Sequence, residues 1–283
     1  MTSPVKIGKT AIIGGDDRQK AMREYLIQKN IECVYCHADD NDIKDKISGA
    51  ACIILPLPLT KDGVNIYDNC EGNVSIDSLL SLLSPKQKIF AGMVSTAVKE
   101  KFALHSLRFC DYFADGALTQ YNAVLTAQGL LRTVIDNTDR SLSRRVLITG
   151  YGRVAKAAAR LFSACSASVT VAVRNEESMA QARCDGFDAV YYPMLKSRIF
   201  IYDIIINTVP AQVIDKALVR SVRDDALMLE AASAPYGIDR RAAEQYRKKL
   251  LLCPGLPGKY TPVSAGRIIA DTVIRLYGED ERI

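Results

Sequence analysis

The sequence predicts an α/β protein with two doubly wound parallel sheets, one after the other along its 283 residues. Three observations lead to this fold class. Short apolar segments alternate with helical patterns in two separate series. One long helical segment, 120–138, divides the two series. A glycine-rich turn joins a strand to a helix at the start of the second series. Such alternation is typical of parallel sheets with helices on both faces.

The first series begins with a strand over 10–15 and a helix over 16–30, whose apolar positions include Met22 and Leu26. Residues 56–73 form a loop in this prediction, because Pro56 and Pro58 cannot donate to a sheet ladder. The other elements expected in this series are strands over 31–36, 50–55, 88–92 and near 108–113, and helices over 41–47, 75–83 and 95–104.

The second series contains more strands, and it is followed by a helical tail over 263–278 that has no strand after it. Its expected strands are 145–149, 168–173, 188–192, 203–207, 226–231 and 249–252, and its expected helices are 153–163, 176–184 and 239–247. We therefore expect an N-terminal substrate domain over 1–119, a linking helix over 120–142 and a nucleotide-binding domain over 143–263. The C-terminal helix, 264–283, is expected to pack back on the first domain.

Composition excludes several classes of protein. The net charge of +5 is modest and the basic residues are scattered, so no nucleic-acid surface is predicted. No run of eighteen apolar residues suggests a membrane span, and the first residues lack the apolar stretch of a signal peptide. A cytoplasmic protein is expected. Cys33, Cys36 and His37 match the spacing of c-type haem attachment, but they lie in a predicted strand; neither haem nor a metal site is expected.

The turn after strand 145–149 has the pattern of a dinucleotide site. Residues 150–155 read G-x-G-x-x-A, with a strand before them and a helix after them. Gly150 permits the tight turn, Gly152 lets a pyrophosphate approach the backbone, and Ala155 keeps the helix near the sheet. The backbone of Tyr151, Arg153 and Val154 completes the turn, and the helix N-terminus offers N–H groups to the anion. A Rossmann domain is predicted; the alternative is a tight turn without a ligand.

The end of strand 168–173 bears on which nicotinamide dinucleotide binds. Arg174 and Asn175 stand where an NAD site usually has an acidic residue for the ribose 2′-hydroxyl. An arginine there suits a 2′-phosphate, so NADP is favoured over NAD, although Arg174 could be an ordinary surface residue. Two further loops follow strand ends and are assigned to the ribose and nicotinamide side of the cofactor. They are Asn207, Thr208, Val209 and Pro210, and then Ala232 and Ser233.

The first domain also has a strand–turn–helix, but it is not a second dinucleotide site. Asp16 and Asp17 would repel a pyrophosphate and suit the helix N-terminus as cap and dipole partners. Arg18 and Gln19 are then expected to face a substrate. Lys259, in the segment 254–259, is a second cation for that purpose.

Together these segments resemble one family. GGDDRQ (14–19), NAVLTAQG (122–129), GYGRVA (150–155), INTVP (206–210) and PGLPGKYTPVSAG (254–266) stand in the order and spacing of the dipicolinate synthase A-subunit family. The likeness covers nearly the whole chain. The chain departs from the family pattern at Leu125 and Gln128, where Pro and Glu are usual, and at Ala114–Gly116, where a charged pair is usual.

The resemblance implies a specific activity. The family oxidises a dihydrodipicolinate-level intermediate, which branches from the lysine pathway, to pyridine-2,6-dicarboxylate during sporulation, with NADP as hydride acceptor. It implies a partner, the flavoprotein-like B-subunit of dipicolinate synthase, and the mother-cell cytoplasm of a spore-forming bacterium. A homo-oligomer is compatible with the sequence but has no particular surface.

The chemistry expected from that activity fits the residues. A dicarboxylate substrate needs cations, and we expect Arg18 and Lys259 to hold its carboxylates, Arg18 bidentately, between the turn 14–19 and the segment 254–259. His37 and His105 are interpreted as structural. Two alternatives stay open, a 2-hydroxy-acid or amino-acid dehydrogenase and an NADP-binding regulatory subunit. The first would need a proton-relay histidine in 230–262, where there is none. The second would lack cations for a substrate.

Overall fold

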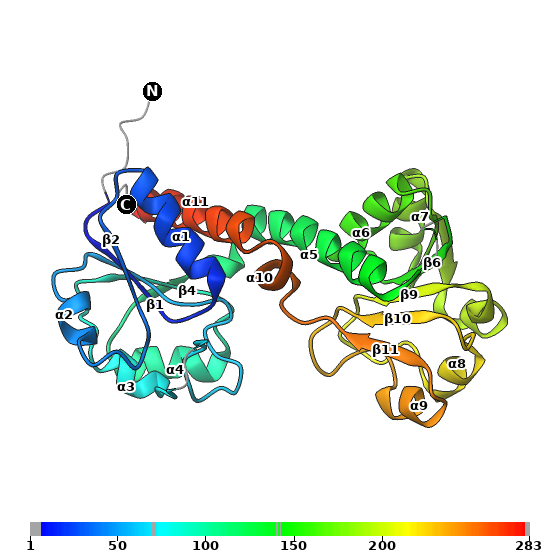
Figure 1. The fold of residues 1–283 in the computed structure, drawn as a ribbon, viewed down its shortest axis with the longest axis horizontal. Helices are drawn as coiled ribbons and strands as arrows, with labels where there is room; N and C mark the ends of the chain where they lie inside the picture. Colours follow the sequence, from blue (N-terminus) through cyan, green and yellow to red (C-terminus); the bar gives the residue numbers. More distant parts are fainter. Residues whose placement is uncertain (1–6, 70–71, 140, 142, 281–283) are drawn as a thin grey trace. The chain divides into compact units, whose positions relative to one another are not determined.

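The structure of the chain is a computed structural model that describes residues 7–69, 72–139, 141 and 143–280. It divides into two compact units, each an α/β sandwich around a parallel sheet (Figure 1). Unit 1 comprises Met1–Tyr121 and Thr261–Ile283, and unit 2 comprises Asn122–Tyr260. The predicted fold class, two doubly wound parallel sheets, is confirmed.

Unit 1 has a five-stranded sheet in the order β2-β1-β3-β4-β5. All its strand pairs are parallel. The strands are β1 (Thr10–Ile13), β2 (Cys33–Cys36), β3 (Cys52–Ile54), β4 (Lys88–Ala91) and β5 (Phe109–Asp111). The helices are α1 (Asp17–Gln28), α2 (Ile43–Ile47), α3 (Ile76–Leu80), α4 (Thr96–Leu104), the 3₁₀ turn η1 (Tyr112–Ala114) and α11 (Pro262–Asp280). The strand order reverses between β1 and β3, which is where such sheets place ligands.

Alternate residues of β1 show why the sheet needs helices on both faces. Ala11 and Ile13 belong to the apolar cluster that includes α2, α3 and α4. Ile12 points the other way, into the cluster of Met22 and Val273 from α1 and α11. Each fully buried isoleucine contributes about 1.5–3 kcal/mol relative to an exposed one. The sequence reads as a continuous apolar run because both faces are covered.

The C-terminal helix α11 lies along α1, so the end of the chain completes the layer that its beginning starts (Figure 1). The two helices approach closely at Gly266, where an added Cβ would lie 2.4 Å from the Arg18 carbonyl oxygen. The Tyr25 hydroxyl donates to Asp271 across the same contact, at 2.8 Å. Among the described residues, no helix is both long and apolar enough to cross a bilayer.

Unit 2 has a six-stranded parallel sheet in the order β11-β10-β9-β6-β7-β8, the order of a Rossmann domain. Its strands are β6 (Arg145–Thr149), β7 (Ser168–Val173), β8 (Asp188–Tyr191), β9 (Ile204–Asn207), β10 (Leu227–Glu230) and β11 (Lys249–Leu252). Its longer helices are α6 (Arg153–Ala164) and α7 (Glu176–Cys184). The strand order reverses between β6 and β9, so the glycine turn of 150–155 lies at the switch point.

The short helices of unit 2 were not predicted. They are α8 (Lys216–Ser221), the 3₁₀ turns η2 (Tyr192–Ser197) and η3 (Ile199–Ile201), and α10 (Leu256–Tyr260), in a segment that we expected to be a loop. The helix α9 (Arg240–Gln245) was expected, but it is shorter than predicted. Elements of five or six residues are too short to show a helical period.

The long helix α5 (Gly116–Asn137) begins four residues before its predicted start, and the boundary between the units falls inside it. Asp115 explains the earlier start, because its carboxylate accepts a hydrogen bond from the Leu118 N–H at 2.8 Å, as an N-cap does.

Candidate functional site

The Gly150–Gly152 turn has the geometry that a dinucleotide site requires. Gly150 has a φ of +84°, and a Cβ there would lie 2.7 Å from Val209 Cγ2, so only glycine fits. Gly152 is the N-cap of α6, and a Cβ on it would meet nothing within 4 Å. Space is therefore open above the helix N-terminus. Ala155 is fully buried against the sheet, as predicted for the last position of the fingerprint.

The N-terminus of α6 is suited to an anion. Gly152 has no side chain to cap the first N–H groups, and the first turn contains no acidic residue. Arg153 is exposed and Val154 is half-buried in that turn. The Tyr151 hydroxyl donates to Asp185 at 2.6 Å, which fixes the side chain of the middle turn residue. An uncapped helix of twelve residues offers both free N–H groups and a positive dipole end to a pyrophosphate.

The N-terminus of α1 in unit 1 is the opposite case. Asp16 caps it, accepting from the Arg18 N–H at 3.0 Å, while the Gln19 side chain accepts from the Asp16 N–H at 2.9 Å. Asp17 adds a negative charge in the first turn. This capping box confirms that the turn is an N-cap. The two glycine turns therefore differ in chemistry, although both follow a first strand.

The residues predicted to hold the 2′ position follow the carboxyl end of β7. Arg174 and Asn175 are both exposed, and Asn175 caps α7 by accepting from the Ser178 N–H at 3.0 Å. In the described part of the chain, the Arg174 guanidinium makes no hydrogen bond or ion pair. Tyr192 lies near it; burial raises the pKa of this phenol, and the charge of Arg174 acts against that rise. The sequence analysis had not singled out Tyr192.

The side chain of Asn207, which we assigned to the cofactor, is held by contacts within the protein, and its contact with a cofactor stays a prediction. It is fully buried, and its amide nitrogen donates to the Val209 carbonyl at 2.9 Å and to Glu230 at 2.5 Å. Its amide oxygen accepts from the Thr149 hydroxyl at 2.5 Å. Both ends of the amide are therefore occupied, and Asn207 links Thr149, Val209 and Glu230 at the switch point.

Glu230 is the second member of this buried network, and the sequence analysis missed it. It is 1% exposed. One carboxylate oxygen accepts from the N–H groups of Gly237 and Ile238, both at 2.9 Å. The other accepts from Asn207 and from the Ala232 N–H at 3.1 Å. A charged residue inside the apolar run LMLEA was the signal that could have revealed it.

The remaining residues assigned to the ribose and nicotinamide side lie around this network. Thr208 is half-buried and donates to the Thr149 carbonyl at 2.7 Å. Val209 is half-buried and packs over Gly150, and Pro210 is exposed. Ala232 is half-buried, with its N–H bound to Glu230, and Ser233 is exposed. Their contacts with a cofactor stay predictions.

Arg18 is placed differently from our expectation. It is 5% exposed, and its Nε and Nη2 donate to the two oxygens of Asp16, both at 2.8 Å. Nη2 also donates to the Leu57 carbonyl. Asp16 therefore occupies the edge of the guanidinium that we expected to hold a substrate carboxylate bidentately, and a contact of Arg18 with substrate stays a prediction. Burial raises the pKa of Asp16, but the bonds from Arg18 outweigh this and hold it below its usual range.

The backbone of the same turn is also occupied. The Gly14 N–H donates to the Cys36 carbonyl at 2.9 Å, and the Gly15 N–H donates to the Tyr67 carbonyl at 2.8 Å. Gln19 is fully buried, and its amide nitrogen has no hydrogen-bond partner among the described residues. The N–H groups of Gly14 and Gly15 are therefore not free to bind a substrate.

The other predicted cation, Lys259, lies in unit 2. It is exposed in α10, with its ammonium 4.8 Å from the centroid of the Tyr260 ring. Leu256, at the start of this helix, packs on α5 at Gly129, where a Cβ would be 2.7 Å from the leucine Cβ. This packing explains why the segments 122–129 and 254–260 belong to one structural unit. A contact of Lys259 with substrate stays a prediction.

Both histidines lie in unit 1 and hold loops in place. The His37 ring shares a hydrogen bond of 2.9 Å with Asp68, whose second oxygen accepts from the Ala38 N–H at 2.8 Å. These bonds attach the segment around Asp68 to the end of β2. His105, after α4, lies 3.6 Å from Asp77 of α3. These contacts agree with the structural roles that we expected.

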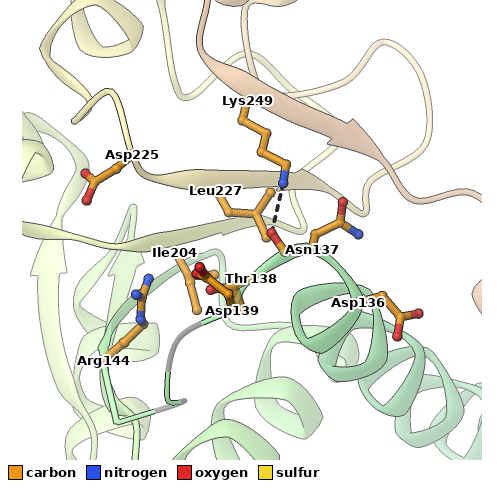
Figure 2. A pocket seen from close by; sticks show the side chains of 9 residues that line it. All are labelled: Asp136, Asn137, Thr138, Asp139, Arg144, Ile204, Asp225, Leu227 and Lys249. Carbon is orange, nitrogen blue, oxygen red and sulfur yellow. Dashed lines mark hydrogen bonds between the residues drawn. The ribbon is translucent and has the colours of Figure 1, made fainter.

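A cavity of about 520 Å³ in unit 2 is not part of the dinucleotide site (Figure 2). Ile204 and Leu227, the first residues of β9 and β10, line it, so it lies at the amino edge of the sheet, whereas Gly150 follows the last residue of β6. Lys249 donates to the Asn137 carbonyl at 2.8 Å there and caps the last turn of α5 (Figure 2). This contact stabilises the helix end.

The two α/β units and the uncapped glycine turn at the switch point define the two-domain fold that dehydrogenases have. Its fold is shared with D-lactate dehydrogenase from Lactobacillus jensenii, solved with NAD⁺, at a TM-score of 0.58 and 14% identity over 96% of this chain and 97% of that one.

Comparison with known proteins places the chain more narrowly. The family model for the N-terminal domain of the dipicolinate synthase A-subunit matches residues 9–113. The A-subunit of dipicolinate synthase from Bacillus subtilis (strain 168) is 29% identical over 291 aligned residues, which cover 96% of each chain. The crystal structure of the corresponding A-subunit from Bacillus halodurans matches with a TM-score of 0.83 and 25% identity, over 96% of this chain and 99% of that one. The N-terminal part of the chain thus matches the family model, and nearly the whole chain is similar to dipicolinate synthase A-subunits. This similarity and the fold support an oxidoreductase.

Proposed function

We propose that this chain oxidises a dihydrodipicolinate-level intermediate to pyridine-2,6-dicarboxylate, with NADP as the hydride acceptor, during endospore formation. The observation that carries the proposal is the open, uncapped N-terminus of α6 at the point where the strand order reverses. The similarity to dipicolinate synthase A-subunits supplies the substrate class. A dinucleotide needs N–H donors for its pyrophosphate, and the chain offers them at the carboxyl edge of the unit 2 sheet.

The dinucleotide, when bound, supplies the acceptor for a hydride. The backbone N–H groups of Arg153 and Val154 would hold its pyrophosphate, over Gly152. Glu230 and Asn207 would act indirectly on the cofactor, because their hydrogen bonds fix the loops at the carboxyl ends of β9 and β10. Oxidation that makes an aromatic ring is strongly driven, so it needs a well-placed acceptor and only a mild base.

The need for only a mild base distinguishes the proposed reaction from that of a 2-hydroxy-acid dehydrogenase. Such an enzyme needs a histidine near the nicotinamide to carry a proton. Residues 122–260 contain no histidine. The sequence of unit 2 therefore favours the aromatising reaction.

NADP is proposed over NAD because Arg174 is exposed at the end of β7 and binds no other group in the described part of the chain. A guanidinium can make two charge-assisted bonds to a phosphate. Glu176 and Glu177 follow it in the first turn of α7, but Glu176 is held by the Tyr191 hydroxyl. Titration of the unmodified chain with NADH and NADPH tests the preference, and equal affinities would contradict it.

The reaction is tested by adding freshly made 4-hydroxy-tetrahydrodipicolinate and NADP, with and without the flavoprotein-like B-subunit, and following the ultraviolet absorbance of the pyridine product. We expect product, and full turnover only with that second protein, which we propose as the partner in the mother-cell cytoplasm. Full turnover by the single chain would contradict the need for the partner. No product under either condition would contradict the proposed reaction.

A substitution at Gly152 gives a sharp control. Gly152→Asp has room for its side chain, has an ordinary φ of −81°, and places a favourable N-cap on α6. We expect it to fold at least as well as the wild type and to lose dinucleotide binding, because its carboxylate takes the N–H groups and repels the pyrophosphate. Gly152→Ala, which adds bulk without charge, should bind more tightly than Gly152→Asp.

A further inference from the structure

The carboxyl edge of the unit 1 sheet has its own switch point, between β1 and β3. Two segments meet there, the Gly14–Gly15 turn after β1 and the residues that follow β3. Arg18, in the first turn of α1 that follows the Gly14–Gly15 turn, donates to the Leu57 carbonyl in the second segment. Open α/β sheets bind ligands at such points. A substrate site in unit 1 is therefore expected here, although the Nε and Nη2 donors of Arg18 are already bound to Asp16.

Lys61 is exposed at this edge, and among the described residues no carboxylate forms an ion pair with its ammonium. Its ammonium is 3.6 Å from the centroid of the Tyr67 ring, and the Tyr67 hydroxyl donates to Asp16 at 3.1 Å. In the part of the chain that the structure describes, Lys61 makes no hydrogen bond and no ion pair. Its ammonium therefore keeps its three donors for a ligand.

The electrostatics of this position favour an incoming anion. Burial lowers the pKa of Lys61; Asp16 opposes that change, and Arg18 adds to it. Asp16 is itself neutralised by its two bonds to Arg18. A carboxylate beside Lys61 would supply the counter-charge that the protein leaves out.

The loop that carries Lys61 is ordered before any ligand arrives. The Asp62 carboxylate accepts from the N–H groups of Val64 and Asn65, at 2.8 and 2.7 Å, and from the Thr60 hydroxyl at 3.0 Å. These bonds close a tight turn around Lys61. The cation is thus held over Tyr67, and binding needs little further ordering of the loop.

We propose that Lys61 binds a carboxylate of the substrate, with Tyr67 as its positioning residue and the Asp16–Arg18 pair as the support of that tyrosine. Lys61 takes the role that the sequence analysis gave to Arg18. The ligand class, a small dicarboxylate, rests on the proposed function. Lys61 itself is argued from its exposure, its contact with Tyr67 and its missing counter-ion.

The test measures binding of pyridine-2,6-dicarboxylate to the full chain by calorimetry. We expect Lys61→Ala to weaken binding by about tenfold or more, the loss of one charge-assisted contact, and Lys61→Arg to restore most of it. Lys99→Ala is the matched control, because Lys99 is an exposed lysine on α4 with no assigned role. Tyr67→Leu should weaken binding less than Lys61→Ala, since it removes only the surface that positions the ammonium.

The outcomes separate this proposal from the one on which it rests. If the wild type binds the dicarboxylate and Lys61→Ala binds it equally well, the role of Lys61 is refuted and the proposed function stands. If the wild type does not bind it, the ligand class is refuted, and the proposed function with it. NADPH affinity and thermal stability should be nearly the same in Lys61→Ala and the wild type, because Lys61 is exposed and makes no hydrogen bond or ion pair among the described residues.

Discussion

Glu230→Gln is expected to destabilise unit 2, although it changes a single atom. Each carboxylate oxygen of Glu230 accepts two hydrogen bonds in a fully buried position. A glutamine keeps the size of the side chain but replaces one oxygen by an NH₂ group. In either orientation two buried donors then face another donor.

The magnitude follows from those two donors. A buried donor without a partner costs about 1–3 kcal/mol, so the substitution should cost about 2–6 kcal/mol. Turning the Asn207 amide over would pair its oxygen with the glutamine NH₂. The same turn would set the Asn207 nitrogen against the Val209 N–H, which now donates to the Asn207 oxygen at 3.2 Å. This rearrangement would therefore leave a different donor without a partner, and the substitution would still lower the free energy of unfolding.

Differential scanning calorimetry measures the effect. A domain of this size loses about 2–4 °C in Tm per kcal/mol, so the transition of unit 2 should fall by about 4–24 °C. Glu244→Gln is the control, because Glu244 is an exposed glutamate in the same unit. We also expect weaker NADPH binding, since Glu230 fixes the loop around Ala232. A Glu230→Gln protein with the melting temperature and NADPH affinity of the control would refute the argument.

Three further predictions concern other positions. Arg174→Asp should weaken NADPH binding by about 1–3 kcal/mol and leave NADH binding much less affected, which fluorescence titration can measure; an equal loss for both nucleotides would contradict the role of Arg174. Gly266→Ala should destabilise unit 1 by about 1–3 kcal/mol in a urea titration, because its Cβ would meet the backbone of α1; an unchanged midpoint would show that the two helices can separate freely. The Asp16–Arg18 pair lowers the pKa of Asp16 below 3.8, so its contribution to stability is present above that pH and is lost as the pH falls through the lower value; Asp16→Asn should remove this acid dependence, and an identical pH profile for the variant would argue against it.

Most of the fold could be predicted because its signals are local. Most strands of both sheets are short runs of apolar residues bounded by turn residues, and their alternation with helices predicts parallel pairing. The glycine fingerprint combines residue type and spacing within six positions. Asp16 as a helix cap is also a local feature, since cap and capped N–H lie two residues apart.

The contacts of the candidate site could not be predicted in the same way, because they join distant parts of the chain. Arg18 looked free to bind a substrate, since nothing in GGDDRQ shows that its fork turns back on Asp16 and reaches Leu57. Asn207 looked like a ligand residue at a strand end, but its partner is Glu230 of the next strand. Lys61 lies in a loop without any periodic pattern. Its place at the switch point depends on Tyr67 and Asp16, which only the tertiary structure brings together.

Unit 1 is built from two separate segments of the chain, and this affects the order in which the two units can fold during synthesis. Its last helix, α11, is synthesised only after all of unit 2. Until then Ile12, Met22 and Leu26 lack Ile269 and Val273, which complete their apolar layer. Domains generally fold as their chains emerge, and exposed apolar surface promotes aggregation. The whole sequence of unit 2 is synthesised before α11. Unit 1 is therefore started before unit 2 but is completed after it.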